Sequence, residues 1–207
     1  MVAACRELNS DLIALTGDWI DAENRFLAPG IARLREVRPP LGWWGVPGNH
    51  DFRESRWRFL RIVREWLGDR LLLNRTAVLE RGGERLALSG LDYAMSYVQQ
   101  RRHLDAWGRQ RPEGLFEIAL AHHPRQFDPL RHAGVRLVLA GHTHGGQISL
   151  TAAPLPSVGP AMYQFRYLRG LYEQDGAKLL VSCGLGHTLP IRVNCPPEIW
   201  QVKLVRG

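Results

Sequence analysis

The stretch "VRLVLAGHTHGGQI", residues 135–148, is an apolar run that ends in two histidines set among three glycines. A short apolar run bounded by glycines is typical of a buried strand. On an extended segment, residues i and i+2 point to the same side, so we expect His142 and His144 to face one point. Two imidazoles that converge on one point favour a transition-metal site, and the alternative is a polar loop with exposed histidines.

Three other apolar runs end in the same way. They are "DLIALTGD" (11–18), "GWWGVPGNHD" (42–51) and "LFEIALAHHP" (115–124). The polar residues at their ends are Asp18 with Asp21, then Asn49, His50 and Asp51, then His122 and His123. In open α/β sheets, ligands bind beyond the carboxyl ends of the strands. The four runs therefore predict a shared metal centre at one sheet edge rather than scattered surface polarity.

The rest of the chain alternates helical patterns with short strands, which indicates an α/β fold. Trp57, Leu60, Val63 and Leu67 mark the apolar face of one predicted helix. Tight-turn residues predict hairpins at "ERGGER" (80–85) and "EQDGAK" (173–178). The last stretch, "EIWQVKLV" (198–205), alternates as an edge strand would.

The composition fits a single domain over residues 1–207 with a net charge of +7. This charge favours anionic partners such as phosphate esters, nucleic acid or a membrane surface, although an arginine-rich composition explains it equally well. Cys5, Cys183 and Cys195 show no CxxC spacing, which argues against a disulfide framework and a zinc finger. No signal peptide is recognisable, and no apolar run reaches the about 18 to 20 residues that span a bilayer.

The predicted ligands are carboxylates, an amide oxygen and imidazoles, without a thiolate. This set favours Mn²⁺, Fe or Zn²⁺ over iron–sulfur chemistry. A carboxylate can bridge two cations, and two cations about 3.5–4 Å apart can clamp a phosphoryl group and activate a water. A histidine that remains off the metals could then protonate the leaving oxygen.

These motifs resemble those of the calcineurin-like metallophosphoesterases. The resemblance rests on "GDWID" (17–21), "GNHD" (48–51), "AHHP" (121–124) and "GHTHGG" (141–146) in this order. Further stretches resemble the small bacterial branch of that superfamily: "GLY" (170–172), "VSCGLG" (181–186), "PIR" (190–192) and "CPPEI" (195–199). Some members of this branch are phosphodiesterases, and a relative cleaves the pyrophosphate of UDP-diacylglucosamine. The resemblance implies a four-layer α/β/β/α sandwich that hydrolyses phosphodiester or pyrophosphate bonds with two divalent metal ions.

The resemblance also implies a role for each motif residue. Asp18 would bridge both metals, His144 would bind the first, and the second would be completed by Asn49, His122 and His142. The nucleophile would be a metal-bridging hydroxide. His50 would be the general acid, oriented by Asp51.

Two residues in or beside these motifs, Asp21 and His123, have no role assigned by the resemblance. Asp21 could support the site or cap the helix that follows it. His123 neighbours His122 on a predicted strand, so we expect its side chain to point away from the site.

The family's Asp-x-His motif at the end of its first strand has no counterpart in this sequence. Residues 1–10 look like the tail of the helix that follows this strand, so we expect an N-terminally incomplete domain that lacks its first strand. The first metal would then keep Asp18 and His144, with Asp21 as a candidate replacement. Three explanations stay open: a start codon assigned too late, a fragment, or a non-catalytic or mononuclear relative that binds phosphate or nucleic acid without hydrolysis.

The expected substrate is a phosphorylated small molecule or a lipid-linked phosphate, with peripheral membrane contact as a further expectation. Nucleic acid fits less well, because no basic stripe interleaved with aromatic residues is present. Substrate selection would lie in residues 92–112 and 151–170, which contain Tyr93, Tyr97, Arg101, Arg102 and Tyr163. We expect the protein in the cytoplasm or peripheral to the cytoplasmic membrane, unless an upstream segment carries an export signal.

Overall fold

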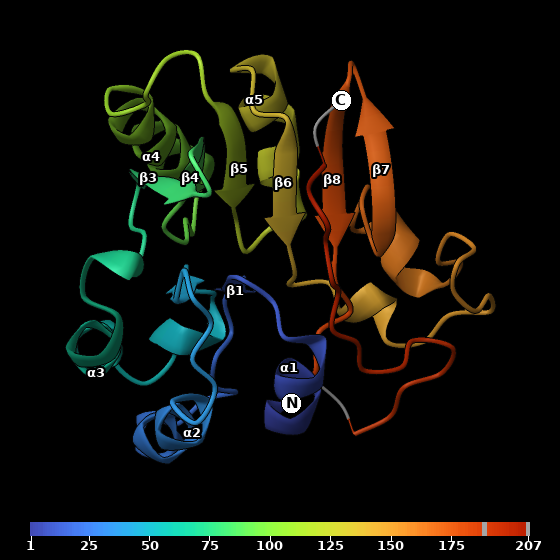
Figure 1. The fold of residues 1–207 in the computed structure, drawn as a ribbon. Helices are drawn as coiled ribbons and strands as arrows, with labels where there is room; N and C mark the ends of the chain where they lie inside the picture. Colours follow the sequence, from blue (N-terminus) through green and yellow to red (C-terminus); the bar gives the residue numbers. More distant parts are fainter. Residues whose placement is uncertain (188–189, 206–207) are drawn as a thin grey trace.

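The computed structural model describes residues 1–187 and 190–205 of the chain. Its strands form two sheets (Figure 1). The small sheet pairs two parallel strands, β1 (Ile13–Leu15) and β2 (Trp43–Gly45). The large sheet has the order β3-β4-β5-β6-β8-β7. Its strands are β3 (Arg75–Arg81), β4 (Glu84–Gly90), β5 (Phe116–Leu120), β6 (Leu137–Ala140), β7 (Gly170–Gln174) and β8 (Ala177–Val181).

Parallel pairing in the large sheet is confined to its centre. β4, β5, β6 and β8 run parallel, whereas β3 and β7 pair antiparallel with β4 and β8 at the two ends. Each antiparallel pair is a tight hairpin, closed by the pairs Arg81–Glu84 and Gln174–Ala177. Both predicted hairpins are therefore confirmed.

Helices cover the outer face of each sheet. They are α1 (Val2–Leu8), α2 (Leu27–Leu34), α3 (Arg56–Leu67), α4 (Tyr97–Gly108) and α5 (Phe127–His132). The first three pack on the small sheet, and the last two pack on the large one (Figure 1). Because Tyr97–Gly108 is helical, the predicted selectivity segment 92–112 is mostly a helix rather than a loop.

Side-chain alternation along the strands explains the layers. In β5, Ala119 belongs to the core under α4 and α5, whereas Ile118 and Leu120 belong to the core between the two sheets. In β2, Trp43 faces the helices and Trp44 faces the large sheet. A strand that is covered on both faces in this way needs apolar residues at successive positions. The molecule is therefore a four-layer α/β/β/α sandwich, as the resemblance implied.

The C-terminal strand prediction is wrong. Residues 198–205 form no strand within the part of the chain that the structure describes. The alternating residues Val202 and Leu204 are exposed, so neither belongs to the core of a sheet. Alternation yields a strand only where a neighbouring strand offers free backbone groups, and 198–205 pairs with none of the described strands.

The predicted face of α3 is also shifted. Its buried residues are Phe59, Val63 and Leu67, and Trp57 is exposed with Arg61 stacked on its ring. Trp57 was expected on this face because it precedes Leu60 by three residues, but a spacing of four residues places Phe59, Val63 and Leu67 on one face of the helix.

Two smaller findings complete the fold. All three cysteines are free and buried, as their spacing suggested. Among the described residues, no helix has both the length and the apolar character that a bilayer crossing requires.

Candidate metal centre

The four predicted ligand clusters meet in the structure, but from two sheets instead of one. Asp18 follows β1, Asn49 follows β2, His122 follows β5 and His142 follows β6. The arrowheads of β5 and β6 lie on the side of the large sheet that is nearer to β1 (Figure 1). The expectation of a single sheet edge is therefore wrong, because β1 and β2 form a layer of their own.

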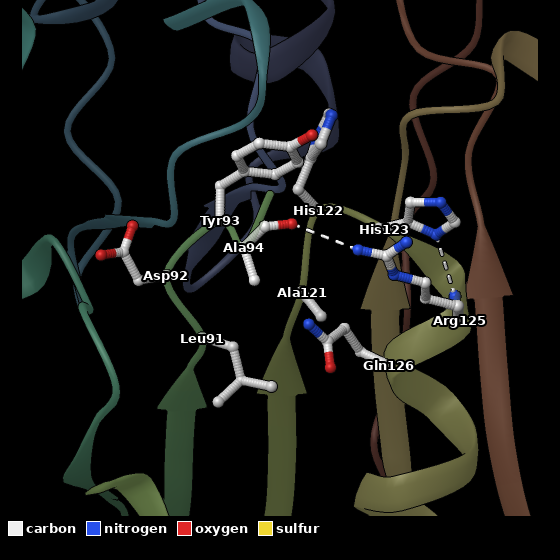
Figure 2. Close-up of a pocket in the computed structure, with 9 residues that line it drawn as sticks. All are labelled: Leu91, Asp92, Tyr93, Ala94, Ala121, His122, His123, Arg125 and Gln126. Atoms are coloured by element: carbon white, nitrogen blue, oxygen red, sulfur yellow. Dashed lines mark hydrogen bonds between the residues drawn. The ribbon is translucent and has the colours of Figure 1, made fainter. Parts of the chain in front are cut away.

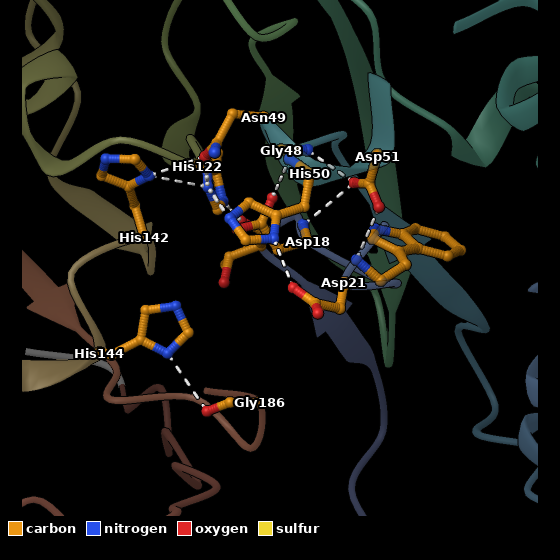
Figure 3. Close-up of polar contacts among 12 residues, drawn as sticks. Asp18, Asp21, Gly48, Asn49, His50, Asp51, His122, His142, His144 and Gly186 are labelled. Atoms are coloured by element: carbon orange, nitrogen blue, oxygen red, sulfur yellow. Dashed lines mark hydrogen bonds and ion pairs between the residues drawn. The ribbon is translucent and has the colours of Figure 1, made fainter. Parts of the chain in front are cut away.

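Four donor atoms of these residues surround one point (Figure 3). His122 donates its Nδ1–H to the carbonyl of Thr16 at 2.8 Å, which directs its Nε2 toward Asp18 and Asn49. That Nε2 lies 3.0 Å from Asn49 Oδ1 and 3.2 Å from Asp18 Oδ2. His142 Nδ1 lies 2.9 Å from Asn49 Oδ1 and 3.1 Å from His122 Nε2.

These separations fit a metal ion better than a hydrogen-bond network. Donors at about 2.1 Å from one metal lie about 3.0 to 3.4 Å from each other. Asn49 Oδ1 and Asp18 Oδ2 are acceptors only, and one cation would satisfy both of them together with the unprotonated Nε2 of His122. Asp18, His122 and His142 also form a group of described residues that could hold a metal ion. The donor set therefore suits one divalent cation.

The protonation states of the histidines agree with ligation. Burial and the charge of His122 lower the pKa of His142 to about 4. Burial also lowers the pKa of His144, and both rings are therefore neutral at pH 7. Burial acts to lower the pKa of His122, but its hydrogen bond to Asp18 and the charge of that carboxylate outweigh burial and raise it. Metal ligation requires the neutral imidazole, so a cation at these donors would compete with the proton that Asp18 favours on His122.

Unusual backbone conformations position three of the predicted ligands. Asp18, His142 and His144 have positive φ angles of 53°, 72° and 52°. Non-glycine residues in the left-handed region are uncommon and cluster at functional sites. β6 ends at Ala140, so the expected extended arrangement of His142 and His144 is wrong. A turn, rather than a strand, orients both rings.

Glycines allow the close approach of the two loops that carry Asp18 and His50. A Cβ atom on Gly48 would meet the carboxylate of Asp18, and its distance to Asp18 Oδ1 would be 2.2 Å. A Cβ on Gly17, where φ is 95°, would lie 2.5 Å from His122 Nδ1. The glycines of "GDWID" and "GNHD" are therefore needed for space as well as for conformation.

His50 is held by Asp21 and not by Asp51. His50 Nδ1 lies 2.9 Å from Asp21 Oδ1, and the backbone N–H of His50 donates to Asp18 Oδ1 at 2.8 Å. His50 Nε2 lies 3.9 Å from Asp18 Oδ2, on the metal side of the ring. Asp21 therefore contacts His50, and it is not the N-cap of the 3-10 helix that follows, which is Glu23.

Asp51 instead holds the loop that carries Asp18. Its buried carboxylate accepts backbone N–H groups of four residues, namely Asp18, Trp19, Ile20 and Gly48. Burial raises the pKa of Asp51 to about 7, against the lowering effect of its hydrogen bonds. The expectation that Asp51 orients His50 is wrong, because the 3-10 turn at His50–Phe52 directs the two consecutive side chains apart.

His144 lies beside this cluster with its ring turned to another loop (Figure 3). Its Nδ1–H donates to the carbonyl of Gly186 at 3.2 Å. The lone pair of the neutral ring is then on Nε2, which is the atom that could bind a metal. Arg192 Nη2 donates to the same carbonyl and to that of Cys183, and it lies 3.4 Å from His144 Nδ1. A histidine ligand commonly donates its second N–H to a backbone carbonyl in this way. The "PIR" stretch contains Arg192, but no sequence pattern predicted its contact with His144.

His123 was expected to point away from the site, and this expectation is wrong. Its ring stacks on His142 with centroids 4.4 Å apart, and its Nδ1 accepts the backbone N–H of Arg125. β5 ends at Leu120, so strand alternation does not extend to residue 123. Phe165 packs edge-on against His142 with centroids 5.6 Å apart, and its ring lies 5.8 Å from that of His123. Sequence reasoning did not identify Phe165, which is far from the motifs.

A cavity of about 10 Å³ lies beside His122 (Figure 2). Its lining includes Tyr93, whose ring packs edge-on to His122, and Gln126, whose buried Oε1 has no hydrogen-bond partner. This volume is about that of one water molecule. The cavity is therefore too small to hold a substrate.

Comparison with known proteins agrees with the geometry. The model of the family described as calcineurin-like phosphoesterase matches residues 1–146. The metallophosphoesterase YkuE of Bacillus subtilis is 30% identical, over 96% of this chain and 69% of its own length. The phosphodiesterase YaeI of Escherichia coli is 28% identical, over 96% of this chain and 72% of its own.

A solved structure shares the fold. The NAD nucleotidase NadN of Haemophilus influenzae aligns over 87% of this chain and 38% of its own, with a TM-score of 0.53 and 14% sequence identity. At this identity the likeness concerns the fold alone.

Proposed function

This chain belongs to the calcineurin-like phosphoesterase family, and we propose that it hydrolyses a phosphodiester or pyrophosphate bond at two divalent metal ions. The observation that carries the proposal is the convergence of Asp18, Asn49, His122 and His142 on one point at metal-ligand spacing. A diester or pyrophosphate is favoured because the related YaeI is named a phosphodiesterase.

The proposed ligands divide between two ions. Asn49, His122 and His142 would hold one ion, His144 would hold the other through its Nε2, and Asp18 would lie between them. Manganese, iron and zinc all suit these donors. When bound, the ions would polarise the phosphoryl group and activate water as the nucleophile.

We assign the general acid to His50. Its ring is fixed through Nδ1 by Asp21, and Nε2 faces the carboxylate of Asp18. A proton on Nε2 would therefore lie next to the phosphoryl group held by the ligands, within reach of the leaving oxygen. Asp51 would act indirectly, because it holds the backbone of the Asp18 loop.

Substitution of His50 by alanine tests this assignment. We expect His50→Ala to bind metal at the stoichiometry of the unmodified chain and to lose about 10²- to 10⁴-fold in turnover of bis(p-nitrophenyl) phosphate with Mn²⁺. His132→Ala is the matched control, since His132 is exposed in α5. Turnover that is unchanged in His50→Ala would remove His50 from the mechanism.

A non-catalytic or mononuclear centre is the second candidate, and one observation favours it. Asp21, the candidate replacement ligand of the first metal, is hydrogen-bonded to His50. Its carboxylate is therefore engaged in a contact other than one with the metal. Elemental analysis after reconstitution with Mn²⁺ separates the candidates: two ions per chain support catalysis, and one ion with no diester hydrolysis supports a phosphate-binding relative. Steeply salt-dependent binding without metal would favour nucleic acid instead.

We further propose that the substrate is a phosphorylated small molecule or a lipid-linked phosphate, and that the protein acts in the cytoplasm or at the cytoplasmic membrane. The net charge of +7 supports an anionic substrate. Arg125, which contacts His123, and Arg192, which contacts His144, are candidates for recognition of this anionic substrate.

A further inference from the structure

The three imidazoles of the proposed metal centre are held in two different ways. His122 donates its Nδ1–H to the carbonyl of Thr16, and His144 donates its Nδ1–H to that of Gly186. Such hydrogen bonds fix the plane of a histidine ring from the side away from its metal-binding atom. His142 instead directs its Nδ1 to the centre, and its Nε2 makes no hydrogen bond to any residue that the structure describes.

The plane of the His142 ring must therefore be set by packing. The torsion that turns a histidine ring about its bond to Cβ has only broad preferences, so the surroundings of the ring decide its angle. The backbone gives little help, because His142 has a φ of 72° and lies on a turn after β6 rather than on the strand. Without support, the ring could turn its Nδ1 away from Asn49.

Two neighbouring rings supply this support. The ring of His123 stacks on that of His142, with centroids 4.4 Å apart and an angle of 28° between the planes. Phe165 contacts both rings: its centroid lies 5.6 Å from that of His142, in an edge-on contact, and 5.8 Å from that of His123. Stacked and edge-on contacts depend on the relative orientation of the rings. Together they favour one plane for His142.

His123 can orient its neighbour because its own ring is anchored. It is the N-cap of the 3-10 helix Pro124–Gln126, and its Nδ1 accepts the backbone N–H of Arg125 at 3.1 Å (Figure 2). The unprotonated nitrogen of the neutral ring is thereby used, and its proton is on Nε2. The group of described residues that could share a metal ion does not include His123. His123 therefore touches a proposed ligand without being one.

We propose that His123 and Phe165 are positioning residues, which hold the ring of His142 in the plane required for metal ligation. The inference rests on the metal centre of the proposed function, but it concerns the affinity for the ion and not hydrolysis. It also gives a task at the metal centre to Phe165, which lies in the segment 151–170 where we expect substrate selection.

Calorimetric titration of the chain with Mn²⁺ tests the proposal through two substitutions that separate the ring of His123 from its helix cap. His123→Asn keeps an acceptor for the N–H of Arg125, since asparagine is a good N-cap residue, but it removes the stacked ring. His123→Phe keeps a ring and removes the acceptor. We expect His123→Asn to weaken Mn²⁺ binding by about 10- to 100-fold, as the loss of a residue that orients a ligand does. His123→Phe should bind Mn²⁺ almost as tightly as the unmodified chain, and Phe165→Leu should weaken binding in the same direction as His123→Asn.

The control is Val63→Ala, which removes buried contacts of α3 in the core beside the small sheet. It should unfold at a lower urea concentration and still bind Mn²⁺ like the unmodified chain, and circular dichroism should show that all variants are folded. Tight binding in His123→Asn, or equally weak binding in His123→Asn and His123→Phe, would overturn the proposal, because the stacked ring would then not determine the affinity. An unmodified chain that binds no Mn²⁺ would overturn this inference together with the metal centre. A chain that binds Mn²⁺ as described here but hydrolyses no diester would contradict the proposed function alone.

Discussion

Gly48 shows how much the metal centre depends on a missing side chain. Its position lies between the Asp18 carboxylate and the loop of His50, where a Cβ would stand 2.2 Å from Asp18 Oδ1. The hydrogen bond from the His50 backbone to the same oxygen fixes the carboxylate from the other side. Asp18 therefore cannot move away from an added methyl without losing this bond.

We expect Gly48→Ala to weaken Mn²⁺ binding at least tenfold and to cost about 1 to 3 kcal/mol of unfolding free energy, as overpacking does. Isothermal titration calorimetry and urea unfolding measure the two effects. Gly30→Ala is the control, because no atom lies within 4 Å of a Cβ at this α2 position. Equal Mn²⁺ affinity in Gly48→Ala and the unmodified chain would show that Asp18 is not a ligand.

Strand β5 carries a buried charge that its neighbours neutralise. Glu117 is 3% exposed and accepts two hydrogen bonds from the Arg111 guanidinium, at 2.6 and 2.8 Å. Ser89 of β4 donates to its other oxygen. This carboxylate lies in the strand that positions His122, so the ion pair supports the element on which the metal centre is built.

Removal of the arginine should leave Glu117 charged, buried and partly unpaired. We expect Arg111→Ala to lower the free energy of unfolding by about 3 to 5 kcal/mol, measured with urea. In the control Arg75→Ala, the remaining partner Asp69 has a side chain that is 89% exposed, and the cost should stay within about 1 kcal/mol. A loss in Arg111→Ala as small as in the control would mean that Glu117 is protonated or hydrated in the folded chain.

The sequence predicted best what depends on residue type and order along the chain. The sequence itself shows which residues can bind a metal and which of them follow apolar runs. This was enough to propose four ligands: Asp18, Asn49, His122 and His142. Whether Asp21 or Asp51 contacts His50 depends on the direction of side chains in a single turn, which no periodicity encodes.

The same limit applies to larger elements. The β3–β4 and β7–β8 hairpins were predictable because Gly-Gly and Asp-Gly turns act locally. The strand predicted at 198–205 required a partner elsewhere in the fold, and local alternation cannot reveal whether one exists.

At the scale of the whole molecule, the proposed ligands come from both sheets. Asp18 and Asn49 follow strands of the small sheet, whereas His122 and His142 follow strands of the large one. A cation bound to all four would therefore connect the two halves of the sandwich, and it would bind the folded chain far better than the unfolded one.

We expect Mn²⁺ at about a hundred times its dissociation constant to add about 2.7 kcal/mol of stability. For a domain of this size, this corresponds to a rise in Tm of about 5 to 10 °C in a calorimetric scan. A chelator should reverse the rise, and His142→Ala should largely abolish it. A Tm that does not respond to Mn²⁺, with metal bound, would place the ion on a surface outside the two sheets.

The hairpins at both ends of the large sheet have a consequence for the order of folding. Hairpins close short loops and form in about 1–10 μs, whereas the parallel pairs β4–β5, β5–β6 and β6–β8 must first close long crossovers. We therefore expect the outer strands to nucleate early and the parallel centre to assemble last. The turns that carry His122 and His142 follow these late strands, so the chain would reach its metal-binding form only at the end of folding.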